Sequence, residues 1–453
     1  MMISIDPILT EKEQAPTTLP TTAESKAEFN WRNCWYPVAF VQDLPKNRPY
    51  TFSLYDEPYV LFRNKDGKLG CMTDRCPHRA AKLSDGQIID GKLECLYHGW
   101  QFSIDGQCLH IPQLPTDAKI PQNSCVRSFK IVERQGIIWM WPGETEIAQE
   151  ESIPIIADLD KPEFVTTDYM CDLPYDQTYF TENIIDPVHI HISHHGTLGN
   201  RKNAHPLEME VIESSHKGIR GRMRNRENSN QPWIPVEFVA PNLVYYRFSI
   251  EQRGWFGAVV FYSIPLSQNR CRILVRNYRN FLTWKLKLTP RWFDHWLRSR
   301  VLEEDLPQIL GQKTEIERLG KPMKEVFLPL KSSDLFVVEY RKWLDKFGFS
   351  LPFYQGYETA KLTDSSKECH QAPVLLDRLD RHTQMCSSCS RAYQVTNKLK
   401  QGAIGIAIAF AAFGIATDGL ASTMAVSASL LAVALAVVAE KAKSKFERSY
   451  TRH

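Results

Sequence analysis

The sequence has few cysteines, no glycine-rich nucleotide-binding motif and little excess charge. Eleven cysteines in 453 residues are too sparse for a disulfide scaffold, and such thiols indicate a reducing compartment where they serve metals or redox chemistry. No G-x-G-x-x-G or P-loop pattern occurs, so we expect another protein to supply flavin, nicotinamide or nucleotide chemistry. The formal charge of +3, from 55 basic and 52 acidic residues, argues against a nucleic-acid-coating protein.

The first thirty residues lack arginine, and they lack a basic segment followed by an apolar stretch. We therefore expect neither a secretory signal nor an organelle transit peptide. The Thr/Pro run from Pro16 to Thr22 can bury little apolar area, so residues 1–29 are predicted to be a mobile tail.

Residues 30–143 are predicted to form an all-β domain. Short apolar runs such as Tyr59–Phe62 and Ile137–Trp141 alternate with Asp-Gly turn signals, which is typical of antiparallel strands.

Residues 144–350 are predicted to form an α+β domain with an antiparallel sheet. Apolar runs at Leu243–Phe248, Ala258–Tyr262 and Cys271–Tyr278 suit adjacent strands. Helical patterns follow around Trp292–Leu310 and over Asp334–Phe347.

The C-terminal part is predicted to hold a loop region at 351–400, a hydrophobic helical hairpin at 401–440 and a basic tail at 441–453. Asp418 is the one charged residue between Gly402 and Val438, and Thr417 to Gly419 would form the turn between two membrane spans. Basic residues flank the pair, so both ends are expected on the cytoplasmic side. The alternative is an alanine-rich hairpin that lies on protein or at the membrane interface, since its first arm is short.

Two short motifs bring together two cysteines and two histidines. Cys76-Pro77-His78 and Cys95-Leu96-Tyr97-His98 are separated by sixteen residues. Two thiolates and two imidazoles are the ligands of a Rieske [2Fe-2S] cluster. The same residue types can also hold tetrahedral zinc, but each pair lies among Asp-Gly turns of a β-domain, as two loop tips closing over one cluster require.

A second ordered set follows in the next domain. Asn183, Asp186, His189 and His194 form the pattern N-x-x-D-x-x-H-x-x-x-x-H, and on a helix the first three would share one face. Non-haem Fe(II) oxygenases bind iron through two imidazoles and one carboxylate, and His189 and His194 are candidates for the imidazoles.

The carboxylate ligand is expected from elsewhere in the chain. Asp305 on a predicted helix is the candidate, and its neighbour Glu304 is the alternative. His191 and His195 also lie in the histidine-rich run, but their spacing does not fit the motif, so we expect them to be outer or surface groups.

Cys386 and Cys389 form a C-x-x-C pair just before the hydrophobic segments. It can be a dithiol switch, half of a zinc site together with Cys369, His370 or His382, or two loop cysteines. As a switch it would be a redox target, with thioredoxin as the candidate partner.

The segment from Trp31-Arg32-Asn33-Cys34-Trp35 through His98-Gly99-Trp100 resembles the Rieske domain of oxygenases. Rieske proteins of quinol oxidation usually carry two more cysteines, and Ala81 and Tyr97 stand at those places. The resemblance therefore implies an oxygenase-type cluster of lower potential that is reduced by a ferredoxin or a ferredoxin-type reductase.

The order of the motifs resembles the Rieske non-haem iron oxygenases, whose catalytic domain has a helix-grip (START-like) fold. The resemblance implies that His189, His194 and Asp305 bind iron. It also implies that Asp186 orients His189 and accepts a hydrogen bond from His98 of a neighbouring subunit, which requires a ring, usually a homotrimer.

Together with the late C-S-S-C and the two hydrophobic segments, the elements Asp186-Pro187-Val188-His189 and His194-His195-Gly196 resemble the pheophorbide a oxygenase family over about residues 31–445. The absence of a recognisable transit peptide departs from the plant members and suggests a bacterial, cyanobacterial relative.

This resemblance implies a membrane-anchored monooxygenase with its catalytic domains on the cytoplasmic side of a thylakoid or plasma membrane. The substrate it implies is a hydrophobic ring system, with a chlorophyll-derived tetrapyrrole such as pheophorbide a as the leading candidate. The alternatives are another apolar aromatic metabolite, or a non-catalytic redox-sensing or electron-transfer subunit of a membrane complex.

Overall fold

The computed structural model describes residues 29–228, 231–359 and 377–450. Two compact units are formed, one by Met1–Leu286 with Gln308–Pro373 and the other by Lys287–Pro307 with Val374–His453. The tail predicted at 1–29 lies outside the described residues except for Phe29. That residue is not part of a mobile tail, because its ring is buried 5.5 Å from the ring of Trp343.

Two antiparallel sheets make up the N-terminal β-domain. The six-stranded sheet has the order β1-β10-β9-β4-β3-β2, and the four-stranded sheet has the order β5-β6-β7-β8. Their strands are β1 (Tyr36–Phe40), β2 (Tyr50–Leu54), β3 (Glu57–Arg63), β4 (Leu69–Thr73), β5 (Gln87–Ile89), β6 (Lys92–Glu94), β7 (Gln101–Phe102), β8 (Cys108–His110), β9 (Ser128–Arg134) and β10 (Ile137–Trp141).

The apolar runs of the sequence become the inner strands of this domain. Every residue of β10 and of its partner β1 is buried, as expected for strands without an alternating polar face. The two ligand motifs lie in loops at the smaller sheet. Asp74 to Gly86 connect β4 of the larger sheet to β5, and Cys95 to Trp100 join β6 to β7.

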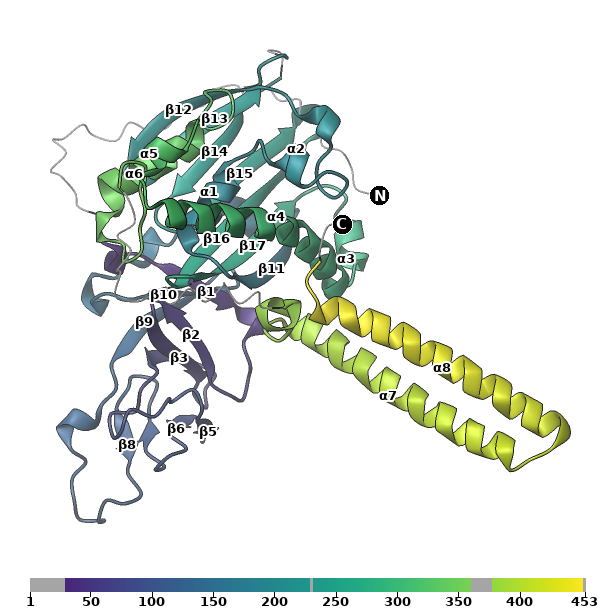
Figure 1. The fold of residues 1–453 in the computed structure, drawn as a ribbon. Coiled ribbons are helices and arrows are strands. Elements are labelled where there is room, and N and C mark those ends of the chain that lie inside the picture. Colours follow the sequence, from purple (N-terminus) through teal and green to yellow (C-terminus); the bar gives the residue numbers. More distant parts are fainter. Residues whose placement is uncertain (1–28, 229–230, 360–376, 451–453) are drawn as a thin grey trace. The chain divides into compact units, whose positions relative to one another are not determined.

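A seven-stranded antiparallel sheet forms the second domain (Figure 1). Its order is β11-β17-β16-β15-β14-β13-β12, and the apolar runs predicted as strands are neighbours in it. The strands are β11 (Val165–Leu173), β12 (Leu207–Ser215), β13 (Gly218–Asn225), β14 (Ile234–Val239), β15 (Leu243–Ile250), β16 (Trp255–Ser267) and β17 (Arg270–Arg279).

Helices α1 (Gln177–Ile185) and α6 (Leu335–Phe347) pack on this sheet. An antiparallel sheet with helices packed against it is the α+β fold expected from the sequence. Four other α-helices lie before α6 in the described chain: α2 (Ile190–Ser193), α3 (Thr283–Leu288), α4 (Arg291–Leu319) and α5 (Met323–Val326). Helix α4 extends beyond its predicted end at Leu310, and Pro307 lies within it.

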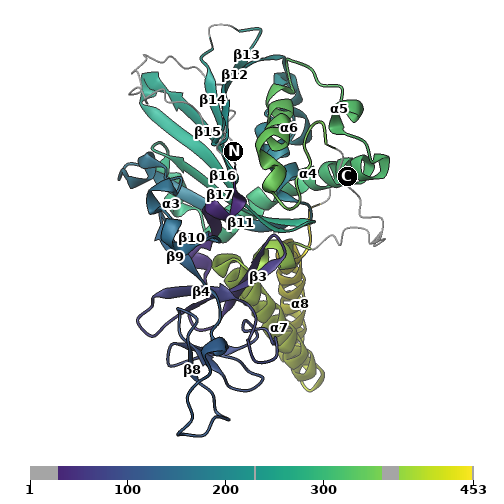
Figure 2. The ribbon, with the colours of Figure 1, turned by 90° about the vertical axis from the view of Figure 1, so that its left-hand side faces the viewer.

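Polar contacts join the β-domain to the seven-stranded sheet, and Figure 2 shows the two as separate layers of strands. Arg272 on β17 is paired with Asp172 on β11, with Nε 2.7 Å from Oδ1, and it also donates to the hydroxyl of Tyr50 at 2.6 Å. Ser53 donates to the carbonyl of Leu266 at 2.8 Å. The two domains are therefore held by directional bonds as well as by apolar contact.

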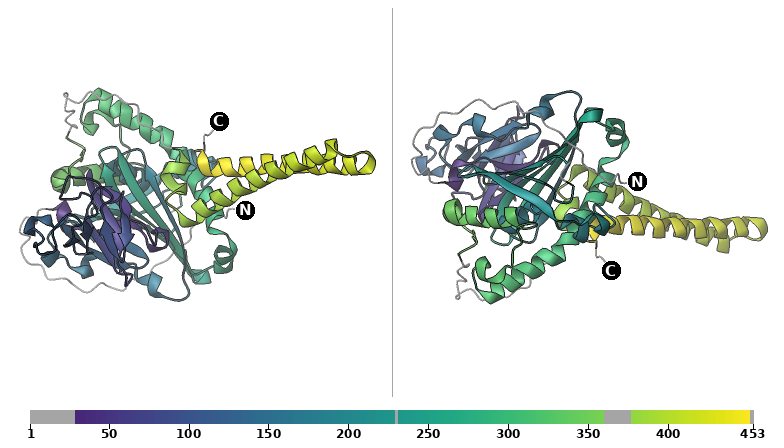
Figure 3. Two further views of the ribbon diagram at one scale, coloured as in Figure 1. Left: turned by 90° about the horizontal axis from the view of Figure 1, so that it is seen from below. Right: turned by 90° about the horizontal axis from the view of Figure 1, so that it is seen from above.

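The second compact unit contains a hairpin of two long helices, α7 (Ser387–Ile415) and α8 (Gly419–Glu447), which lie side by side along their length (Figure 3). Both are long and apolar enough to cross a bilayer. The loop predicted at 351–400 is partly helical, because a short helical turn covers Leu379–Thr383 and α7 begins at Ser387. The side chain of Cys386 caps α7 by accepting from the N–H of Cys389.

Candidate metal centres

The two ligand loops of the β-domain share one backbone pattern. In the first loop, Cys76 N–H donates to the carbonyl of Ala81 at 2.8 Å, and Ala80 N–H donates to the carbonyl of Cys76 at 3.0 Å. In the second, Cys95 N–H donates to Trp100 at 2.9 Å and Gly99 N–H donates to Cys95 at 2.8 Å. Ala80 and Gly99, at the same place in the two loops, both have positive φ, 58° and 74°.

The four ligand side chains differ in exposure in the way a Rieske cluster requires. Cys76 and Cys95 are 2% and 1% exposed, whereas His78 is exposed and His98 is half-buried. The two imidazole rings lie with centroids 4.4 Å apart, and the Trp100 ring stacks on His78 at 4.8 Å. The donor set therefore fits a cluster with an inner iron held by cysteine and an outer iron held by histidine.

The charge state of His98 also suits a metal ligand. Desolvation, and the neighbouring positive charges of His78 and Arg79, hold the pKa of His98 below its usual value. A neutral imidazole offers the nitrogen lone pair that iron needs.

The second ordered set is divided by a break in the helix. Asn183 lies on α1, but α1 ends at Ile185, and Asp186 is its C-cap. Pro187 follows, and a residue before proline avoids helical backbone. The expectation that Asn183, Asp186 and His189 share one helical face is therefore wrong, because His189 lies beyond the break, at the start of α2.

His189 is oriented by the backbone of this break. Its Nδ1 lies 2.6 Å from the carbonyl oxygen of Asp186 and 3.6 Å from the Asp186 carboxylate. A carbonyl oxygen only accepts, so Nδ1 carries the proton and Nε2 is the unprotonated nitrogen. Metal-binding histidines are typically held in this way.

His194 follows α2 and is buried, and its ring centroid lies 5.3 Å from that of His189. Asp305, the predicted carboxylate ligand, is buried on the part of α4 that belongs to the second compact unit. Two imidazoles with one carboxylate are the donor set of a non-haem iron site. Glu304, the alternative carboxylate, is buried as well.

The two remaining histidines of the run hold the following loop together. His191 Nδ1 accepts from Asn200 N–H at 3.4 Å, and His195 Nδ1 accepts from Arg201 N–H at 3.2 Å. They therefore have backbone partners in the loop, as expected for outer groups.

Tyr246 on β15 is a positioning residue that the sequence did not reveal. Its hydroxyl donates to the carbonyl of Ile184 at 2.7 Å, two residues before Asp186. Burial and the charge of Asp186 raise the pKa of Tyr246, so the phenol stays protonated and can donate. An apolar strand with several tyrosines gave no signal for this contact.

Comparison with known proteins places these sites in a family. The profile of the Rieske [2Fe-2S] domain matches residues 34–130, and the profile of pheophorbide a oxygenase matches residues 238–323. Protein TIC 55 of Pisum sativum is 34% identical over 421 residues, which are 87% of this chain and 76% of the relative. The chain belongs to the pheophorbide a oxygenase family of Rieske oxygenases.

Other similarities extend over the same regions. The chloroplastic pheophorbide a oxygenase of Oryza sativa subsp. japonica is 32% identical over 94% of this chain and 85% of its own. The crystal structure of dicamba monooxygenase bound to dicamba has a TM-score of 0.60 at 24% identity, and the match covers 70% of this chain and 97% of that one. As a member of this family the chain is a Rieske non-haem iron oxygenase, with a [2Fe-2S] cluster and a mononuclear iron as its cofactors.

The C-x-x-C pair of this family member lies in a buried cluster of four side chains. Cys386 and Cys389 are not joined in a disulfide, and they lie against His295 and His382. Hydrogen bonds from Cys389, His295 and His382 lower the pKa of the Cys386 thiol against the opposing effect of burial. Two of the partners proposed for a zinc site, Cys369 and His370, lie outside the described residues.

His295 is the member of this cluster that sequence reasoning missed. It lies 91 residues before Cys386, so no local spacing connects them. His382, at H-x-x-x-C-x-x-C, is close enough in sequence to be proposed, and it is in the cluster.

Proposed function

We propose that this protein is a membrane-anchored monooxygenase that oxidises a hydrophobic ring substrate, with a chlorophyll-derived tetrapyrrole such as pheophorbide a as the leading candidate. The observation that carries the proposal is the oriented pair His189 and His194, in a chain whose relatives include pheophorbide a oxygenases. Asp305 is the proposed third iron ligand. When bound, the cluster supplies single electrons and the mononuclear iron activates dioxygen.

The protein's own residues have separable roles in this proposal. Cys76, His78, Cys95 and His98 hold the cluster. The backbone carbonyl of Asp186 fixes the tautomer of His189. The Asp186 carboxylate can therefore accept a hydrogen bond from a partner subunit. Asn183, half-buried on α1, is proposed to be a catalytic residue together with Asp186. We propose that His98 of the partner subunit donates to the Asp186 carboxylate in a homotrimer.

The exposed edge of His78 supports reduction by a soluble donor. Arg75, Arg79 and Lys82 belong to the same loop as His78 and are exposed. Basic residues at such a surface favour encounter with an acidic carrier. A ferredoxin or a ferredoxin-type reductase fits this surface.

Helices α7 and α8 support a membrane anchor, with the catalytic domains on the cytoplasmic side of a thylakoid or plasma membrane. Lys398 and Lys400 lie near the middle of α7, just before its apolar part, and Lys441 lies after the apolar part of α8. The named relatives are chloroplast proteins, and the bacterial, cyanobacterial origin stays a prediction.

The test has two steps. Iron and acid-labile sulfide are first measured in anaerobically purified chain, for which we expect about three irons and two sulfides. Pheophorbide a, another chlorophyll derivative and a smaller aromatic compound are then offered with ¹⁸O₂, ferredoxin and reductase. One labelled oxygen atom in the tetrapyrrole product supports the proposal.

Two results would favour the alternatives. Label in the small aromatic alone would reassign the substrate to another apolar metabolite. About two irons and two sulfides, unchanged after Fe(II) is added, would leave the second site empty and favour a redox-sensing or electron-transfer subunit.

A further inference from the structure

We propose that His295, His382, Cys386 and Cys389 form a structural zinc site at the base of the helical hairpin. It is separate from both iron centres. All four residues belong to the second compact unit, and each offers one ligand atom within 4.8 Å of the others.

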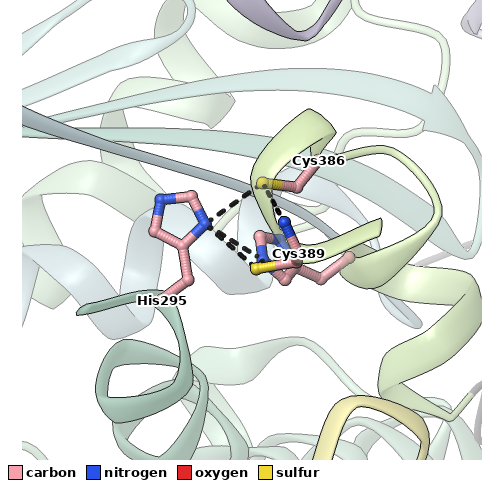
Figure 4. Close-up of side chains that lie close together, drawn as sticks. His295, Cys386 and Cys389 are labelled. Atoms are coloured by element: carbon pink, nitrogen blue, oxygen red, sulfur yellow. Dashed lines mark hydrogen bonds between the residues drawn. The ribbon is translucent and has the colours of Figure 1, made fainter. Parts of the chain in front are cut away.

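The distances between the ligand atoms match a tetrahedral ion. His295 Nδ1 lies 3.3 Å from Cys386 Sγ and 3.6 Å from Cys389 Sγ (Figure 4). His382 Nε2 lies 3.2 Å from His295 Nδ1 and 3.2 Å from Cys389 Sγ. Zinc bonds of about 2.3 Å to sulfur and about 2.0 Å to nitrogen at tetrahedral angles place S···N pairs about 3.5 Å apart and N···N pairs about 3.3 Å apart.

Hydrogen bonding alone explains this arrangement poorly. A ring nitrogen has one in-plane position, occupied either by a proton or by a lone pair. His295 Nδ1 nevertheless lies within 3.6 Å of three other ligand atoms, and it can make a good hydrogen bond to one of them. A central cation satisfies all four groups, since each directs one lone pair at it.

The donor set and the burial indicate a closed site. The four side chains are 1–2% exposed, and two sulfurs with two nitrogens in tetrahedral array favour zinc. Four protein ligands leave no open position, which is typical of structural rather than catalytic zinc. The same burial disfavours a thioredoxin target, because exchange requires a thiolate to reach the sulfur.

The local backbone is also arranged for a thiolate. Cys386 caps α7, and the N–H of Cys389 points at its sulfur at 3.5 Å. The N-terminus of a helix favours negative charge. Binding would release the proton of each thiol that is protonated in the metal-free chain, and no electron is transferred.

Such an ion would tie three segments of the second unit together. His295 comes from α4, His382 from the turn Leu379–Thr383 and the cysteines from the start of α7. Glu303 lies eight residues after His295 on α4. It makes a buried ion pair with Arg378, with Arg378 Nε 2.9 Å from Glu303 Oε1. The proposed zinc and this ion pair would hold the base of the hairpin to α4 at two positions along that helix.

The first experiment uses the full chain, produced with added zinc and purified in detergent without chelator. We expect about one zinc per chain by plasma mass spectrometry. Zinc-edge X-ray absorption should show two sulfurs at about 2.3 Å and two nitrogens at about 2.0 Å. Absence of zinc, an oxygen-rich shell, an extra iron in its place, or a Cys386–Cys389 disulfide would overturn the proposal.

The second experiment assigns the ligands. The double variant Cys386→Ser, Cys389→Ser should lose the zinc and keep the two sulfides of the cluster, whereas Cys125→Ser, at an exposed cysteine, should keep both. Zinc retained by the double variant would place the metal elsewhere. The absorption measurement needs no variant, so the proposal stays testable even if the double variant does not fold.

Discussion

His189 makes its short contact with the main chain of Asp186, not with the carboxylate: Nδ1 is 2.6 Å from the carbonyl oxygen and 3.6 Å from Oδ2. The carboxylate instead accepts the N–H of Val188 at 2.8 Å through Oδ1. Orientation of His189, the proposed iron ligand, and the charge of Asp186 are therefore separable by mutation.

We predict that Asp186→Asn keeps the mononuclear iron but slows its reduction. The amide oxygen can still accept from Val188, and the backbone carbonyl still holds His189, so iron content should stay at about three per chain. Loss of the carboxylate should slow single-turnover electron transfer to the mononuclear iron by about a hundredfold, the cost of a few kcal/mol for one charged hydrogen bond.

Asp186→Ala is the companion variant, because it also removes the acceptor for Val188. It should slow the transfer as much as Asp186→Asn and lose some iron in addition. Transfer at the normal rate in both variants would show that Asp186 is not the link between the centres.

We predict that His189→Ala and His194→Ala each lower the iron content from about three to about two per chain with sulfide unchanged, because two protein ligands rarely hold iron alone. His191→Ala and His195→Ala are the matched controls, since they remove neighbouring histidines that contact backbone N–H groups. Equal iron loss in all four variants would mean that the loop itself had collapsed.

The features that could be predicted from the sequence are those that short-range spacing encodes. Cys76 and His78 lie in one loop, Cys95 and His98 in another, and the apolar runs became strands of the sheets. Pro187 ends α1 despite the helical spacing around Asp186, because a residue before proline avoids helical backbone. The pairing of His295 with Cys386 depends on two segments 91 residues apart, and no short-range pattern encodes such a contact.

The two cluster loops give a prediction about backbone strain. Gly99→Ala should weaken cluster retention, because a Cβ there would stand 2.9 Å from Pro112 Cγ at a φ of 74°. Ala80 already has a positive φ, so Ala80→Gly relieves strain and should leave the cluster intact. The reduced-cluster electron paramagnetic resonance signal per chain measures both; equal loss in the two variants would contradict this account.

The buried pair Asp172 and Arg272 gives a prediction about stability. Their side chains are 1% and 6% exposed, and Arg272 also contacts Tyr50 of the β-domain. Asp172→Ala would leave a buried guanidinium without its carboxylate, which costs about 3–5 kcal/mol. A clear fall in the thermal midpoint by circular dichroism is expected.

Two further variants separate lost charge pairing from lost packing. Asp172→Leu combined with Arg272→Met replaces both charges by apolar groups, and it should be less destabilised than Asp172→Ala, since no charge is left buried alone. Glu208→Gln breaks the more exposed pair with Arg224 and should cost less than about 1 kcal/mol. If the double variant were the least stable of the three, the contact of Arg272 with Tyr50, rather than its charge pairing, would be what stabilises this junction.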